Sequence, residues 1–240
     1  MPSPHDTLQA RRRFYAKVDV APADGGFAVR LDGRTPRSPA GRPLALPRAA
    51  LAGLVAEEWA AQGEYLQAAS MPATRLAWTA IDRAAGLRSE LAAEVARFAA
   101  TDLVCYFAEH PASLVRRQQE LWAPVIAWAE QALGVSFRRA HGIAHQAQPQ
   151  ATLDRIAALA AETCDFTLTG LAFGAALFGS AILSFALQRG EITADAAFQL
   201  SRLDETFQEE RWGLDAEAAA RADAIAADAV ALGRWFEALR

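Results

Sequence analysis

The chain has 240 residues, of which 52% are hydrophobic and 22% are charged, a composition typical of a folded globular protein. Its formal net charge of −4 gives no general electrostatic attraction to nucleic acid or to an anionic membrane, so we expect neither as a partner. The single lysine, Lys17, does not follow a glycine-rich loop, which excludes a P-loop phosphate site.

The first 47 residues combine short β-prone runs with frequent turns. Residues 14–20 and 27–31 are the two β-prone runs, and Asp24-Gly25-Gly26 between them is a hairpin-turn sequence. Residues 36–47 contain several prolines and a glycine, which do not fit inside a helix. We therefore predict a small antiparallel β region at the start of the chain.

Beyond residue 47 the apolar residues recur at helical spacing. Alanine, the strongest helix former, is by far the commonest residue in the chain. Helices are predicted from 48 to a stop at Gly63, from 72, and over 87–107, 114–133, 152–164, 166–188, 193–212 and 215–239, with a short strand and loop over 137–150. The predicted fold class is α+β: an N-terminal β-rich domain with one helix over residues 1–70, then a larger, mostly helical domain over residues 71–240.

Residues 166–188 contain no charged side chain and are long enough to cross a bilayer. Gly170 and Gly174 also have the G-x-x-x-G spacing of packed membrane helices. However, Thr, Gly and Ser interrupt the stretch, and no aromatic or basic cluster flanks it. We predict a helix buried on all sides within a helical domain; a membrane-embedded scaffold is the weaker alternative.

Residue patterns for catalysis or metal binding are missing from the sequence. His141 and His145 are four residues apart, but two histidines without a nearby carboxylate are incomplete for zinc. Neither G-x-S-x-G nor G-x-G-x-x-G occurs. We therefore predict a binding protein without enzyme activity, metal or cofactor.

Two cysteines, Cys105 and Cys164, lie far apart and outside any C-x-x-C pattern. This spacing favours two reduced, mostly buried thiols in a reducing compartment, with Cys105 on an apolar helix. The N-terminal residues run into Arg11-Arg12-Arg13 without the apolar segment of a secretory signal, so we expect a cytoplasmic location.

The segment from 200 to 213 places an aromatic side chain among carboxylates. Its apolar stripe consists of Leu200, Leu203 and Phe207. Trp212 falls about 150° from that stripe, beside Glu205 and Glu209, so it either packs over the chain reversal at Gly213 or awaits a partner. Asp204, Glu205, Glu209 and Glu210 also suit an ordinary solvated face. A competing hypothesis is an enzyme that uses Glu205 or Asp204 as general base, with His141 or His145 as its partner.

Several sequence runs occur in one order over nearly the whole chain. They include Phe14-Tyr-Ala-Lys-Val-Asp-Val, Glu58-Trp-Ala-Ala-Gln, Met71-Pro-Ala-Thr-Arg-Leu-Ala-Trp, Thr101-Asp-Leu-Val-Cys-Tyr and Leu203-Asp-Glu-Thr-Phe-Gln-Glu-Glu-Arg-Trp-Gly. Together these runs resemble the assembly chaperones of the F-type ATP synthase catalytic sector, which attend its alpha subunit. The sequence departs from the family's habit at Phe107, where a basic residue is common, and at Ala123, where an acidic residue is common.

The resemblance implies a small β domain followed by a helical domain, with no enzyme activity and no cofactor. It implies that the chain binds the free alpha subunit and prevents its aggregation before the ring assembles. A functional carboxylate of the family matches Asp204 and Glu205, of which we favour Glu205, and we add Trp212 and Glu209 to the expected partner-binding residues. We expect a monomer from a bacterial cytoplasm, or from the mitochondrial matrix if the chain is a processed eukaryotic form.

Overall fold

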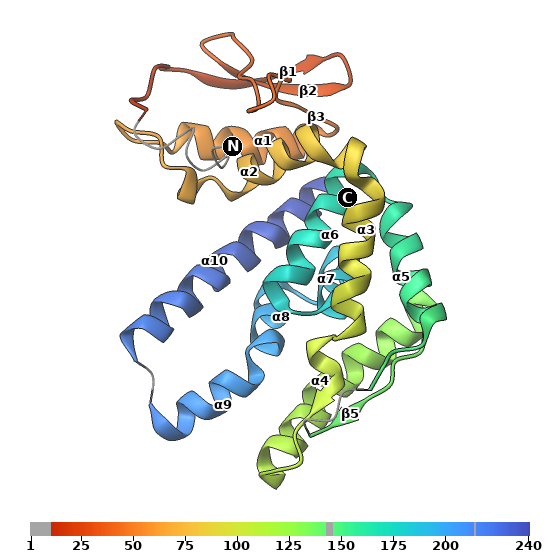
Figure 1. The fold of residues 1–240 in the computed structure, drawn as a ribbon. Helices are drawn as coiled ribbons and strands as arrows, with labels where there is room; N and C mark the ends of the chain where they lie inside the picture. The colour runs from red at the N-terminus through yellow and green to blue at the C-terminus, as the bar shows by residue number, and fades with distance from the viewer. Residues whose placement is uncertain (1–10, 143–145, 214) are drawn as a thin grey trace. The chain divides into compact units, whose positions relative to one another are not determined.

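The structure is a computed structural model, which describes residues 11–142, 146–213 and 215–240 (Figure 1). Contacts divide the chain into two units. The first unit consists of the chain up to Leu87 together with Asp165–Gly170 and Arg234–Arg240, and the second consists of Arg88–Cys164 and Leu171–Gly233. The predicted domains over residues 1–70 and 71–240 stay a prediction, because these units are defined by contacts and not by independent folding.

The first unit contains a three-stranded antiparallel sheet. Its strands are β1 (Val18–Ala23), β2 (Gly26–Leu31) and β3 (Ala45–Leu46), in the order β1-β2-β3. The predicted hairpin is confirmed, because Ala23 pairs with Gly26 across the turn. Gly26 has a φ of 142°, and a Cβ there would lie 2.1 Å from the Leu46 carbonyl oxygen, so this turn requires glycine.

The first strand begins later than predicted, at Val18 instead of Phe14. The amide groups of Ala16 and Lys17 donate to the carboxylate of Asp32 at 2.7 to 3.2 Å. These backbone groups therefore pair with a side chain and not with a neighbouring strand. The alternation of apolar residues could not reveal this difference.

Helices cover one side of the sheet in the first unit, where α1 (Ala49–Ala60) contacts all three strands (Figure 1). It is followed by η1 (Ala68–Ser70), α2 (Pro72–Thr79) and the π-helical turn η2 (Ala80–Ala84). The Glu58 carboxylate on α1 accepts hydrogen bonds from the amides of Ala73 and Thr74, at 2.7 and 2.8 Å. Glu58 thus satisfies the free N–H groups at the start of α2.

The remaining elements of the described chain are mostly helices. They are α3 (Ala85–Ala100), η3 (Leu103–Cys105), β4 (Tyr106–Phe107), α4 (Ala112–Leu133), β5 (Ala140–His141), α5 (Gln150–Ala161), α6 (Asp165–Phe178), α7 (Ala181–Arg189), α8 (Ala194–Ser201), α9 (Leu203–Trp212) and α10 (Ala216–Leu239). Helix α4 contacts α5, α7 and α9 within the second unit. The α+β fold class is confirmed.

Three predicted helices are interrupted, and the apolar stretch 166–188 is one of them. Gly179, with φ of 63°, ends α6, and the Ser180 hydroxyl accepts from the Leu183 amide at 3.0 Å to begin α7. The predicted helix 193–212 breaks at Arg202 into α8 and α9, and the predicted helix 87–107 ends at Ala100. Within the part of the chain that the structure describes, no helix has the length and apolar character needed to cross a membrane.

Asp102 explains why the chain leaves the helix before Phe107. Its fully buried carboxylate accepts from the Ser180 hydroxyl at 2.5 Å and from the Ile182 amide at 3.0 Å. Burial raises the pKa of Asp102 to about 7, and these hydrogen bonds oppose the shift. Asp102 therefore joins η3 to the first turn of α7.

The two cysteines differ in exposure. Cys105 is buried, as predicted, but it lies in η3 and not on a long helix. Cys164 is exposed, which contradicts the prediction that both thiols are mostly buried. It stands at the N-cap position of α6, outside the apolar face of that helix.

Candidate functional site

Helix α9 (light blue in Figure 1) is attached to α4 through a buried amide side chain. Gln118 on α4 is fully buried; its oxygen accepts from the Ala108 amide at 2.8 Å, and its nitrogen donates to Asp204 at 2.7 Å. Burial raises the pKa of the half-buried Asp204, the Gln118 hydrogen bond lowers it, and the charge of Glu205 raises it further. Asp204 therefore faces the body of the second unit and fixes the first turn of α9.

A second attachment lies near the other end of α9. Arg117 forms a two-pronged ion pair with Glu210, at 2.7 and 2.9 Å. Arg211 stacks on the Phe207 ring, 4.2 Å from its centroid, and donates to the Ser113 hydroxyl at 3.0 Å. Planar guanidinium groups hold carboxylates and aromatic faces in a defined orientation. Both ends of α9 are thus held on α4.

Glu209 pairs with Arg202, the residue at the break between α8 and α9. The two side chains are 2.6 Å apart and are 25% and 13% exposed, respectively. A pair that is shielded from water in this way is screened less than an exposed pair. Glu209 therefore stabilises the bend that sets the direction of α9.

Two side chains on the outward face of α9 lack such contacts. Glu205 is exposed and makes no hydrogen bond or ion pair with any residue that the structure describes. Trp212 is 77% exposed, so it does not pack over the chain reversal at Gly213. Trp212 stands seven positions after Glu205, which places the two on one helix face about two turns apart. This face joins a carboxylate to a large apolar surface.

The structure thus divides the four residues expected to bind a partner. Asp204 and Glu209 are engaged within the second unit, whereas Glu205 and Trp212 are available. Sequence reasoning missed Gln118, although a signal for it exists. Gln118 stands four residues after Leu114 and four before Trp122, so it is a polar residue on the apolar stripe of α4.

The described residues do not assemble the catalytic pair of the alternative hypothesis. His141 is exposed in β5, where its ring lies 5.8 Å from that of Phe107, and His145 lies outside the described residues. Asp204 has an amide as its partner, and an amide is not a proton-transfer group at neutral pH. In residues 11–142, 146–213 and 215–240, no group of three or more His, Cys, Asp or Glu is placed to hold a metal ion.

Comparison with known proteins gives one consistent result. A family described as ATP12 chaperone protein matches residues 12–130. Among curated proteins, the mitochondrial protein atp12 of Schizosaccharomyces pombe is 29% identical over 215 residues, which cover 84% of this chain and 74% of that protein.

Solved structures agree over almost the full chain. Atp12 from Paracoccus denitrificans is 41% identical, with a TM-score of 0.89, covering 95% of this chain and 98% of that chain; an aspartate-to-lysine mutant of it gives the same values. The protein Atu1473 from Agrobacterium tumefaciens is 38% identical, with a TM-score of 0.90, covering 95% of this chain and 86% of that chain.

Proposed function

Because the chain belongs to the ATP12 chaperone family, whose members are ATP synthase assembly factors and not enzymes, we propose that it binds the free alpha subunit of F-type ATP synthase. It keeps that subunit from aggregating until the catalytic hexamer assembles. A subunit that awaits its partner exposes an apolar interface, and such surfaces aggregate unless they are covered.

The outward face of α9 is the proposed contact surface. The exposed Trp212 supports this proposal most strongly, because tryptophan is enriched among the residues that dominate binding energy at interfaces. Glu205, two turns away, supplies a charge that selects a basic group on the alpha subunit. A surface that combines one apolar anchor with polar neighbours can release its client more readily than an obligate interface.

Asp204 and Glu209 have a positioning role in this proposal. Their bonds to Gln118 and Arg202 hold α9 before any partner arrives. A surface that is already ordered loses less conformational entropy on binding, which increases affinity. The client therefore meets Glu205 and Trp212 in a fixed arrangement.

Co-expression tests the proposal directly. The tagged chain is expressed with ATP synthase alpha and beta subunits and purified under native conditions. We expect the alpha subunit to co-purify and the beta subunit not to. Recovery of neither subunit would contradict the function, and recovery of the beta subunit alone would show that the partner is wrong.

A pair of double variants tests the surface separately from the function. One variant carries Glu205→Gln and Trp212→Ala; the control carries Glu191→Gln and Val230→Ala, which change an exposed carboxylate and an exposed apolar side chain outside α9. We expect only the first variant to lose the alpha subunit. Equal recovery by both would leave the function in place and reject α9 as the contact.

We further propose that the chain acts as a monomer in a bacterial cytoplasm, or in the mitochondrial matrix if it is a processed eukaryotic form. The Paracoccus and Agrobacterium structures support the bacterial assignment. Light scattering of the purified chain tests the monomer: a mass of 25.8 kDa is expected, and twice that mass would contradict it.

A further inference from the structure

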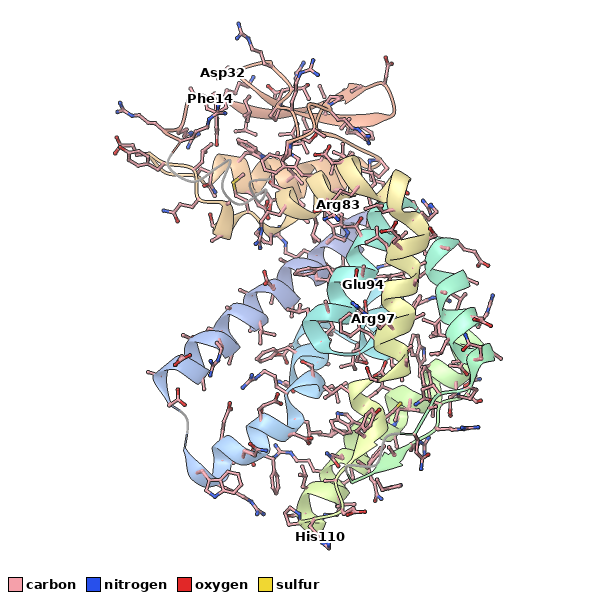
Figure 2. All side chains as sticks on the ribbon, in the orientation of Figure 1. Phe14, Asp32, Arg83, Glu94, Arg97 and His110 are labelled. Carbon is pink, nitrogen blue, oxygen red and sulfur yellow. The ribbon has the colours of Figure 1, made fainter. Side chains whose placement is uncertain are left out.

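The first unit contains a cavity of about 650 Å³. It is lined by residues that precede β1, by the connection from β2 to β3, and by α1 and α2. Figure 2 labels two of these lining residues, Phe14 and Asp32, which come from separate segments at one edge of the first unit. This volume lies in the range of cavities that bind small molecules.

Four aromatic rings along the cavity form a continuous series. Phe14 is 5.3 Å from Tyr15, Tyr15 is 5.7 Å from Trp59, and Trp59 is 6.3 Å from Trp78, measured between ring centroids and each with edge-to-face geometry. Phe14 is 62% exposed, whereas Trp59 and Trp78 are 2% and 5% exposed. The cavity thus has an apolar lining that runs from solvent to the core.

The two tryptophans hold unsatisfied hydrogen-bond donors. The indole nitrogens of Trp59 and Trp78 have no hydrogen-bond partner among the residues that the structure describes. Both nitrogens are covered by neighbouring atoms, so an acceptor on a ligand would reach them only as the rings shift on binding. The indoles of Trp122 and Trp235, in contrast, donate to backbone carbonyl groups at 3.0 and 3.1 Å. Buried donors without acceptors are rare in native proteins and call for an explanation. A ligand with carbonyl oxygens would supply the acceptors.

The rim of the cavity carries an excess of positive charge. Arg11, Arg34 and Arg37 line it, together with one carboxylate, Asp32. Asp32 accepts from two backbone amides, which lower its pKa, so its charge is already stabilised within the first unit. Arg34 is exposed and makes no ion pair with a described residue. The rim therefore favours an anionic group.

We propose that this cavity binds an extended segment of a client polypeptide that carries an apolar side chain next to a carboxylate. The apolar side chain enters the aromatic lining, main-chain carbonyl groups accept from Trp59 and Trp78, and the carboxylate pairs with Arg34. A peptide supplies all three features at once. The proposal goes beyond the surface on α9, because it concerns the other unit and does not depend on which polypeptide is the client.

Indole nitrogen signals in NMR spectra of the full-length, ¹⁵N-labelled chain test the proposal. The probe is the acetylated, amidated peptide Asp-Leu-Phe-Asp, and Trp59→Phe and Trp78→Phe assign the two signals. We expect both signals to move downfield on titration, as new hydrogen bonds form, while the signal of Trp212 stays in place. Unmoved Trp59 and Trp78 signals would overturn the proposal without affecting capture of the alpha subunit.

Matched probes and variants define the chemistry. The peptide Asn-Leu-Phe-Asn lacks the charge, and Asp-Ser-Ser-Asp lacks the apolar side chains; we expect both to bind more weakly. Arg34→Gln should weaken binding of Asp-Leu-Phe-Asp roughly two- to fivefold, the range for one exposed ion pair. Arg48→Gln, an exposed arginine outside the cavity lining, should leave it unchanged. If Arg34→Gln and Arg48→Gln changed the peptide affinity equally, the ion pair with Arg34 would be rejected. If decanoate moved the two indole signals as far as the peptide does, the ligand would be a fatty-acid carboxylate and not a peptide.

Discussion

Gln118 donates a hydrogen bond of 2.7 Å to Asp204 and so joins the buried stripe of α4 to the first turn of α9. The same side chain accepts from the Ala108 amide through its oxygen. The amide supplies a donor and an acceptor at one buried position, which neither an apolar side chain nor an ionised carboxylate can do.

Gln118→Glu should destabilise the protein in a pH-dependent manner. The new carboxylate keeps the bond from Ala108 but faces Asp204, so repulsion raises the pKa of the carboxylate pair in the folded protein. Because the pKa is higher in the folded than in the unfolded state, the variant loses stability at high pH. The loss disappears at low pH, where the carboxylate pair takes up a proton. Thermal unfolding across this range measures the difference from the parent chain. The exposed neighbour Gln119→Glu is the control, and a loss independent of pH would contradict the repulsion.

Glu205→Gln should leave stability unchanged and weaken binding of the alpha subunit. Substitution of an exposed side chain without partners alters stability by no more than about 0.5 kcal/mol. Loss of a charge that pairs with a basic group in an interface costs about 2–5 kcal/mol of binding when the pair is desolvated. Calorimetry and a binding titration check the two quantities, with Glu191→Gln as the control. A large drop in melting temperature would make Glu205 a structural residue.

Trp212→Ala should also separate binding from stability. The side chain is 77% exposed, so its removal takes little buried surface from the folded chain. A tryptophan at the centre of an interface contributes about 2 kcal/mol or more, which predicts a strong loss of alpha-subunit capture. Val230→Ala, which removes another exposed apolar side chain, should retain capture. If Trp212→Ala binds as well as the parent, the anchor lies elsewhere.

Asp102→Asn should change the pH dependence of stability. The folded pKa of about 7 lies above the ordinary value of 3.8, so the folded chain holds a proton that the unfolded chain releases between these values. Stability therefore falls as the pH rises through this interval, and the neutral asparagine removes that fall. The free energy of unfolding of the variant, taken relative to that of the parent, should therefore increase as the pH rises from about 4 to about 7. Denaturant unfolding at several pH values measures this difference in unfolding free energy. A difference that does not change with pH would contradict the prediction.

Gly174→Ala should destabilise the protein by about 1–3 kcal/mol, the usual cost of overpacking. A Cβ at Gly174 would lie 2.6 Å from the Ser184 hydroxyl and 2.8 Å from a Leu232 methyl group. Gly53, inside α1, has open space at the same position, so Gly53→Ala should stabilise the protein by up to about 1 kcal/mol. Thermal unfolding compares the melting temperatures of the two variants with that of the parent. Similar changes for both variants would contradict the packing argument.

The hairpin could be predicted from sequence because its cause is local. Asp24-Gly25-Gly26 encodes the turn within adjacent residues, whereas the break between α6 and α7 depends on distant ones. Gly170 and Gly174 continue the helix and Gly179 ends it, although all three are glycines in an uncharged run. Ser180 begins α7 with a hydroxyl that is held by Asp102, 78 residues away. Helical periodicity contains no information on such a partner.

The candidate site shows the same limit. The helical pattern correctly put Trp212 on a face apart from the buried Leu203 and Phe207. It could not tell Glu205 from Asp204 or Glu209, because the difference lies in Gln118 and Arg202. A helical period gives the direction of a side chain but not the identity of its neighbours. Gln118 on an apolar stripe was the one available sign of the contact.

The first unit draws residues from widely separated parts of the chain, and this affects how the protein is made. Trp235 donates to the carbonyl of Phe166, and the ring of Phe236 would meet a side chain at Gly170. The sheet and α1 are synthesised long before residues 234–240, so during translation the first unit lacks part of its core. A member of a chaperone family is therefore expected to expose part of its own core while it is being synthesised.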